Sequence, residues 1–185
     1  LGLPNSSMEL TRRDAAAALA ALGAGGVAAV AVGRTDDNAG QQADDIDEAA
    51  IRATMVAAAE VVYPNAVSGV DEFVNAFLDS RLAGDRHAAA VDNAVAALND
   101  RANSWYDDRF AALAVDTRDA VLREMAVDTA EPRREGTTRE MVRYYVVNEL
   151  LLALYSSPTG GELVGIENPQ GYAGGINSYQ RGPQT

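Results

Sequence analysis

The sequence has no cysteine, no lysine and only one histidine among its 185 residues. The absence of cysteine excludes disulfide bonds, thiolate nucleophiles and cysteine-ligated iron–sulfur clusters in this chain. With His87 as the single imidazole, carboxylates are the only abundant metal ligands. All 15 basic residues are arginine and they face 27 acidic residues, which gives a net charge of -12. This charge disfavours a broad surface for nucleic acid or for an anionic membrane.

Large apolar side chains are also scarce, because aromatic residues make up 6% of the chain while 36 residues are alanine. The core is therefore expected to be packed from small residues with few large anchors. An acidic, lysine-free, alanine-rich composition is typical of adaptation to very high salt, where screening removes the self-repulsion of the surface. We therefore expect a halophilic protein.

Apolar residues recur at helical spacing and predict an all-α fold, a small bundle of about five helices. Residues with the pattern of helix caps mark the predicted starts of three of these helices. Ser68 with Asp71, and Thr137 with Glu140, are predicted capping boxes, and Thr117 is a predicted N-cap. The expected helices cover residues 44–62, 70–82, 87–106, 118–125 and 138–156.

The N-terminal region has the pattern of a twin-arginine export signal. Arg12 and Arg13 follow a short polar start, and residues 15–32 carry no charge. The alternative is an ordinary alanine-rich helix, which the three glycines within 23–26 disfavour. Asp14 departs from the signal pattern, since bulky apolar residues usually follow the arginines. Cleavage near 29–31 and retention as an uncleaved anchor are both open.

The expected organisation is an N-terminal extension with the signal over 1–32, a linker over 33–42, a helical domain over 43–157 and a C-terminal arm over 158–185. From residue 160 onward no helical or strand period is found, and seven of the 16 glycines lie there. The arm keeps two tyrosines, which ordinary disordered tails lack. We expect it to pack on a surface, either that of a partner or that of this chain's own helices.

Several segments together resemble the small subunit, subunit 3, of gluconate 2-dehydrogenase-like complexes, in its halophilic archaeal form. The tail is the most specific part of this resemblance. The segments are residues 11–14, 62–64, 73–82, 110–113, 118–125, 165–175 and 178–183.

The resemblance implies an accessory, non-catalytic subunit of an oxidoreductase complex. Its large partner would be an FAD-dependent dehydrogenase of the glucose-methanol-choline type, acting on a sugar, a sugar acid or an alcohol. The small subunit would supply the twin-arginine signal and escort the flavoprotein through the translocase to the extracellular face of the membrane or the cell surface. Electrons would pass on through a separate haem or iron–sulfur carrier. No cofactor is expected in this chain.

The C-terminal arm is the predicted docking segment, because its prolines stiffen turns and its tyrosines and arginine are typical interface anchors. The residues predicted to dock on the partner are Asn168, Pro169, Gly171, Tyr172, Gly174, Gly175, Ser178, Tyr179 and Arg181.

No catalytic residue, cofactor-binding residue or metal ligand is predicted. His87 at a helix start is expected to have a surface or capping role. The acidic run at 44–48 lacks the spacing of a calcium loop and is interpreted as a solvated helix start. The aromatic pairs 105–106 and 144–145 are expected in the core. The alternative function is a free-standing secreted hydrolase that depends on carboxylates. Acids such as Asp107, Asp108 and Asp116 are so abundant in this chain that the sequence singles out no glycosidase-like pair.

Overall fold

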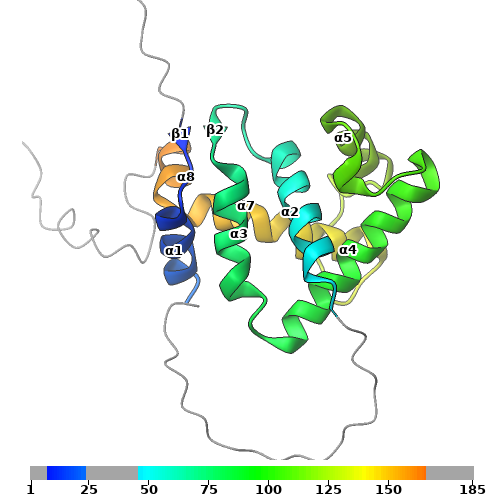
Figure 1. The fold of residues 1–185 in the computed structure, drawn as a ribbon, viewed down its shortest axis with the longest axis horizontal. Coiled ribbons are helices and arrows are strands. Elements are labelled where there is room, and N and C mark those ends of the chain that lie inside the picture. The colour runs from blue at the N-terminus through cyan, green and yellow to red at the C-terminus, as the bar shows by residue number, and fades with distance from the viewer. Residues whose placement is uncertain (1–7, 24–45, 166–185) are drawn as a thin grey trace, which may run out of the picture.

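The structure, a computed structural model, describes residues 8–23 and 46–165 (Figure 1). It confirms the predicted all-α class, since two short strands are the only extended pairing among these residues. The elements are β1 (Met8–Glu9), α1 (Arg12–Ala21), α2 (Glu48–Val62), β2 (Val67–Ser68), α3 (Val70–Arg81), α4 (Asp85–Tyr106), the 3₁₀ turn η1 (Phe110–Ala112), α5 (Val115–Glu124), α6 (Thr138–Val142), the π-helical segment η2 (Arg143–Asn148), α7 (Glu149–Ser156) and α8 (Pro158–Leu163).

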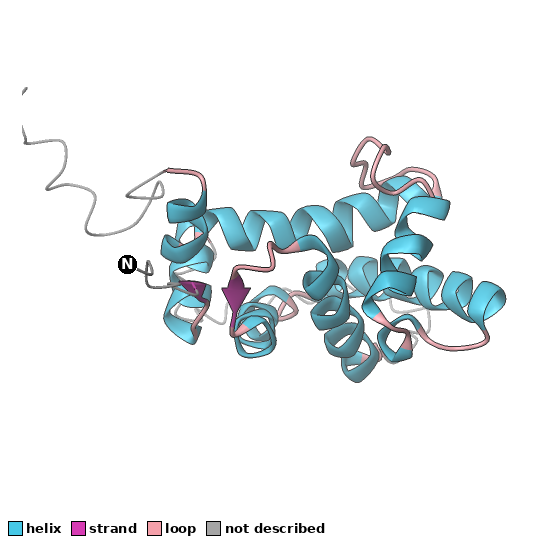
Figure 2. Cartoon of the chain, turned by 90° about the horizontal axis from the view of Figure 1, so that it is seen from above, coloured by secondary structure: helices cyan, strands magenta, loops and turns pink. Residues whose placement is uncertain are grey.

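One long helical rod organises the bundle. The elements α6, η2 and α7 follow one another without a break, and the rod crosses behind α2 and α3 (Figures 1 and 2). Its first part contacts α4, its middle contacts α2 and α4, and its last part contacts α1, α2 and α8. The rod is therefore the element that both ends of the bundle share.

The core follows the helical spacing seen in the sequence. On α3, Phe73, Val74, Phe77 and Leu78 are all buried, as their spacing predicts. Among the described residues the largest fully buried side chains include three phenylalanines, and many of the remaining buried residues are alanine or valine. The expected core of small residues with few large anchors is confirmed.

Two predicted helix boundaries are confirmed. Helix α2 ends at Val62, where Tyr63 turns extended ahead of a proline that cannot continue the helix. Helix α6 starts with the predicted capping box: the backbone N–H of Thr137 donates to Glu140 Oε2 at 2.8 Å.

Two predicted N-caps are wrong. Ser68 does not cap α3, because its backbone pairs in β2, where its carbonyl accepts from the N–H of Leu10 at 2.8 Å. The cap is Gly69, in the left-handed conformation at φ 73°. Helix α5 begins at Val115, with Ala114 as N-cap, so Thr117 lies inside its first turn.

Two helices lie outside the range 43–157 predicted for the helical domain, and both pack against helices inside it. Helix α1 packs on α3, α7 and α8, and the short parallel pair β1–β2 holds the chain just before it. Helix α8 covers residues 158–163, so the expectation of no helix from residue 160 is wrong over this stretch. The Ser157 hydroxyl caps α8, accepting from Gly160 N at 3.0 Å, and Gly160 is buried against Leu154. Packing thus forms a helix that periodicity does not show.

Among residues 8–23 and 46–165, no helix combines the length and the apolar character that a membrane crossing requires.

Candidate functional site

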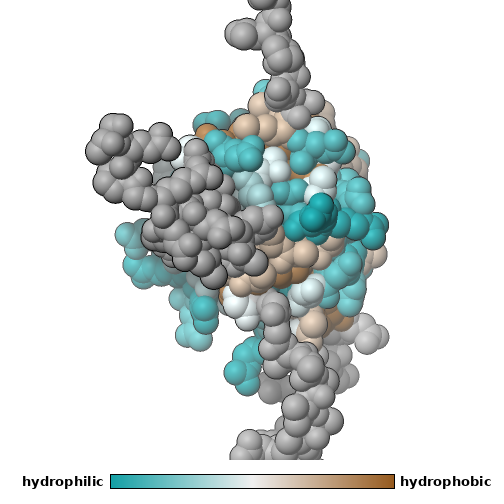
Figure 3. All heavy atoms as spheres, turned by 90° about the vertical axis from the view of Figure 1, so that its left-hand side faces the viewer, coloured by the Kyte–Doolittle hydropathy of each residue, from teal (hydrophilic) through white to brown (hydrophobic). Residues whose placement is uncertain are grey.

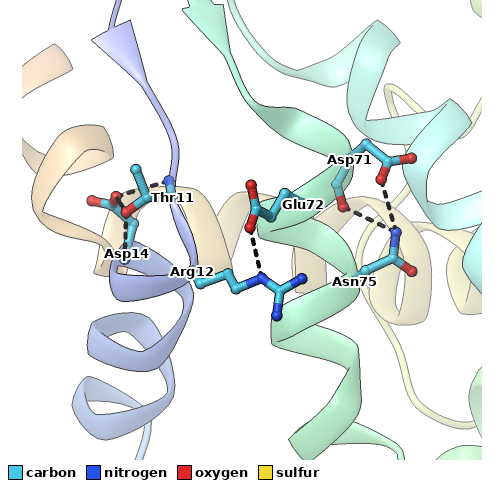
Figure 4. A network of polar contacts seen from close by, with 6 residues as sticks. All are labelled: Thr11, Arg12, Asp14, Asp71, Glu72 and Asn75. Carbon is cyan, nitrogen blue, oxygen red and sulfur yellow. Dashed lines mark hydrogen bonds and ion pairs between the residues drawn. The ribbon is translucent and has the colours of Figure 1, made fainter.

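The two arginines of the predicted signal lie at the start of α1, on the surface of the bundle. Thr11 is the N-cap, so Arg12 and Arg13 occupy the first two helical positions, and both side chains are exposed. Arg12 Nε lies 2.6 Å from Glu72 Oε1 in the first turn of α3 (Figure 4). Two cations at the positive end of a helix dipole are unfavourable for the helix itself. The exposed ion pair with Glu72 is the contact that offsets this cost for Arg12.

Asp14, next in sequence, fixes the start of α1 to the start of α8. Its Oδ2 accepts from Thr11 N at 2.9 Å and from Thr11 Oγ1 at 2.6 Å. Its Oδ1 accepts from Thr159 Oγ1 at 2.7 Å and from Thr159 N at 3.2 Å. Burial acts to raise the pKa of Asp14, but these four hydrogen bonds together hold the pKa below its ordinary value. The carboxylate is thus a charged clamp between two helices that are far apart in sequence.

A second polar cluster lies where the end of α3 and the start of α4 meet the rod. Arg81 donates to both carboxylate oxygens of Glu149, at 2.9 and 2.7 Å, and Glu149 is only 6% exposed. His87 Nε2 lies 3.7 Å from Glu149 Oε1, and its ring is 6.0 Å from that of Tyr145. This bidentate pair joins the first half of the bundle to the rod.

The expected surface or capping role of His87 is wrong. Its side chain is only 28% exposed and lies next to Glu149. Burial lowers the pKa of His87, and although the carboxylate of Glu149 raises it, the positive charges of Arg81 and Arg134 oppose that effect. The net pKa lies below the ordinary value for histidine. Sequence reasoning missed this cluster because residues 81, 87 and 149 are distant along the chain.

The acidic helix start and the predicted docking residues are the other residues singled out in the sequence. Asp47 caps α2, accepting from Ala50 N at 2.9 Å, so the helix starts at Glu48 and not at residue 44 as predicted. No group of three or more carboxylate or imidazole residues within 8–23 and 46–165 is arranged to hold a metal ion. The nine docking residues predicted between 168 and 181 lie outside the described residues.

The aromatic pairs behave differently from each other. Tyr144 and Tyr145 pack edge to face, 4.8 Å apart, and Tyr145 is buried, as expected. Trp105, expected in the core, is 40% exposed with the guanidinium of Arg101 5.0 Å from its ring, so that expectation is wrong. A cation over the face of an indole is stable at the surface, which helical spacing alone does not reveal.

Large apolar side chains are exposed on the last part of the rod. Leu152 is 44% exposed and Tyr155, one turn further along α7, is 43% exposed. Val164, which follows α8, is 51% exposed. Leu152 and Tyr155 lie one turn apart on one helix, and exposed apolar residues that gather in this way are typical of protein contact surfaces.

These features define a small all-α protein whose buried polar groups join its own helices. Residues 49–174 match the family described as Gluconate 2-dehydrogenase subunit 3. The chain belongs to this family, which is that of a subunit of an oxidoreductase complex. No curated protein and no solved structure matches this chain.

Proposed function

We propose that this chain is the non-catalytic small subunit and export escort of a large FAD-dependent dehydrogenase of the glucose-methanol-choline type. The partner would oxidise a sugar, a sugar acid or an alcohol and pass its electrons to a haem or iron–sulfur carrier. The observation that carries this proposal is the family match over residues 49–174, which spans α2 to α8. FAD and the chemistry belong to the partner.

The proposed signal consists of Arg12, Arg13 and the uncharged residues that follow. The exposure of both arginine side chains supports this role, because a receptor reads them only if they are accessible. The complex would be exported through the twin-arginine translocase and act at the extracellular face of the membrane or at the cell surface. The mass of the exported chain distinguishes removal of the signal from its retention as an anchor.

The proposed docking surface combines the exposed face of α7 with the arm. Leu152 and Tyr155 support this choice, because apolar and aromatic side chains of this kind are the usual anchors of an interface. The arm residues, with Tyr172 and Tyr179 as their largest anchors, remain a prediction for this surface.

The first test is co-purification of the tagged full-length chain from cells that also express the flavoprotein, in high salt. We expect a yellow complex whose absorbance spectrum is that of a bound flavin. Substituting Leu152→Ser and Tyr155→Ser should weaken the complex. The matched control is Val115→Ser, an equally exposed apolar residue on α5. A colourless chain that purifies alone would refute the subunit role.

The second test addresses export. Arg12→Lys with Arg13→Lys should leave both proteins inside the cell, because the charge is kept while the forked arginine donors are lost. The control is Arg133→Lys with Arg134→Lys, the same change at another adjacent pair. Export of the flavoprotein at the normal level with the first pair of changes would refute the escort role. The apparent mass of the exported chain reports whether the signal is cleaved.

We also propose that the protein is halophilic. Circular dichroism in dilute buffer should show loss of helicity that added salt restores, because salt screens the repulsion between surface carboxylates. Full helicity without salt would contradict this part of the proposal.

A further inference from the structure

The proposed signal and the folded body are not separate parts of this molecule. Helix α1 lies along one edge of the bundle, beside α8 and α3 (Figure 1). Leu10, Ala15, Ala18 and Leu19 are buried there. The described part of the proposed signal, apart from the exposed arginine side chains, is therefore packed on the surface of α3, α7 and α8.

We propose that this surface of α3, α7 and α8 is a docking site for the chain's own signal segment. Helix α1 occupies the site in the free subunit and leaves it when the segment is presented to the translocase. This inference rests on the proposed function, because it assigns Arg12 and Arg13 to an export signal.

The composition of α1 is the first argument for release. A helix that stays on a protein surface has polar residues on its outer face. Beyond Arg12 and Arg13 in the first turn, the outer face of α1 carries the exposed alanines Ala16 and Ala20, and no charged residue follows Asp14 in the helix. Figure 3 views the side of the molecule on which α1 and α8 lie, where apolar and hydrophilic residues are mixed. From Ala15 onward the helix has no charged face, which suits a second environment as well as this one.

The polar contacts of α1 are the second argument, because they join the signal to residues outside it. Arg12 pairs with Glu72 of α3, and Asp14 accepts two hydrogen bonds from Thr159 of α8. Asp14 is the residue at which this chain departs from the usual signal pattern. The docked state accounts for that departure, since an apolar residue at position 14 would have no bond to Thr159.

The body of the protein also fits the segment closely. A Cβ atom added at Gly69 would lie 2.2 Å from the carbonyl oxygen of Leu10, so glycine allows the two backbones to approach. The far side of the bundle has large buried side chains of its own, Phe110 on η1 and Leu98 on α4. The elements that η1 and α4 mainly contact do not include α1. Departure of α1 therefore leaves that part of the core in place.

The test changes the docking site and leaves the signal sequence intact. Hydrogen–deuterium exchange is measured on the full-length chain in high salt, with and without the pair of changes Thr159→Val and Glu72→Gln. The matched controls are Thr129→Val and Asp119→Asn, which remove a threonine hydroxyl and an exposed carboxylate far from α1. Export of the same variants is followed in cells.

In the unaltered chain we expect α1 amides to exchange through an opening that leaves the α3 amides protected. In the double variant α1 exchange should become about tenfold faster, the order expected when hydrogen bonds to a charged group are lost. Export should become faster as well, and the control variants should change neither rate.

The outcomes separate this inference from the proposed function. If α1 and α3 amides exchange together, α1 is a permanent part of the fold and the docking site is refuted. Faster α1 exchange without faster export also refutes it, because release would then not govern presentation. If the changes Arg12→Lys and Arg13→Lys leave export unaltered, the proposed function fails, whatever the exchange data show for α1.

Discussion

Replacing Arg81 with methionine tests whether the ion pair with Glu149 holds the rod in place. The change removes both donors of a bidentate pair and leaves a carboxylate that is 6% exposed. Breaking a buried pair from one side costs several kcal/mol, because the remaining charge is desolvated without compensation. Since the Arg81 side chain keeps 27% exposure, we expect the lower end of that range, about 3 kcal/mol.

The assay is urea unfolding followed by circular dichroism, in buffer with high salt. A loss of about 3 kcal/mol lowers the unfolding midpoint by roughly 1–2 M urea for a domain of this size. The double variant Arg81→Met with Glu149→Met should recover most of the loss, because replacing both charges with apolar groups removes the desolvation cost. A loss below about 1 kcal/mol for the single variant, or no recovery in the double variant, would refute the reasoning.

The single histidine provides a second readout from the same samples. His87 faces both Arg81 and Glu149, so its NMR titration reports on the charges of the pair. Removing Arg81 should raise the pKa of His87, because a nearby positive charge is lost. Glu149→Gln should lower the pKa further, because the neighbouring negative charge is lost. An unchanged pKa of His87 in both variants would show that the three side chains are not in contact in solution.

Three further predictions concern contacts between helices. Hydrogen exchange in α1 should accelerate as the pH falls below about 4, because the pKa of Asp14 is lowered in the folded state. The stabilisation by the charged carboxylate is therefore present above the ordinary pKa and is lost as the pH falls below it. An exchange rate that is independent of pH, after correction for intrinsic exchange, would contradict the clamp. Tyr63→Phe should cost about 1 kcal/mol in urea unfolding, since the buried hydroxyl donates to the Leu150 carbonyl at 2.9 Å; no loss would mean that this bond is not formed. Gly160→Ala should cost about 2 kcal/mol or more, because its Cβ would lie against the Leu154 carbonyl; a stable variant would contradict the packing of α8.

The helices of the bundle were predictable because their apolar spacing is local information. Phe73 and Phe77 follow the 3.6-residue period closely, and both are fully buried. The capping box at Thr137 was predictable for the same reason, since its two partners lie three residues apart.

Features that depend on distant segments were not predictable. Ser68 has the sequence of an N-cap, but the backbone N–H of Leu10, far earlier in the chain, donates to its carbonyl, and Gly69 is the cap instead. The contact between Arg81 and Glu149 likewise spans 68 positions. The alanine-rich segment after Arg13 has no polar face, so its sequence does not distinguish a packed helix from an export signal.

The π-helical segment determines where the rod tolerates a change in length. A π-helical segment carries one more residue than the α-helical path between the same points. Deleting one residue within 143–148 would let this segment close to an α-helix, so that α7 keeps its orientation relative to α6 and Glu149 stays opposite Arg81. Each residue of an α-helix turns it by about 100°, so the same deletion inside α6 would rotate everything that follows by that angle. Glu149 would then turn away from Arg81, and the face that exposes Leu152 and Tyr155 would turn with it. The rod thus accommodates a change of one residue in length at the π-helical segment, whereas such a change in α6 would alter which face of α7 is offered to solvent.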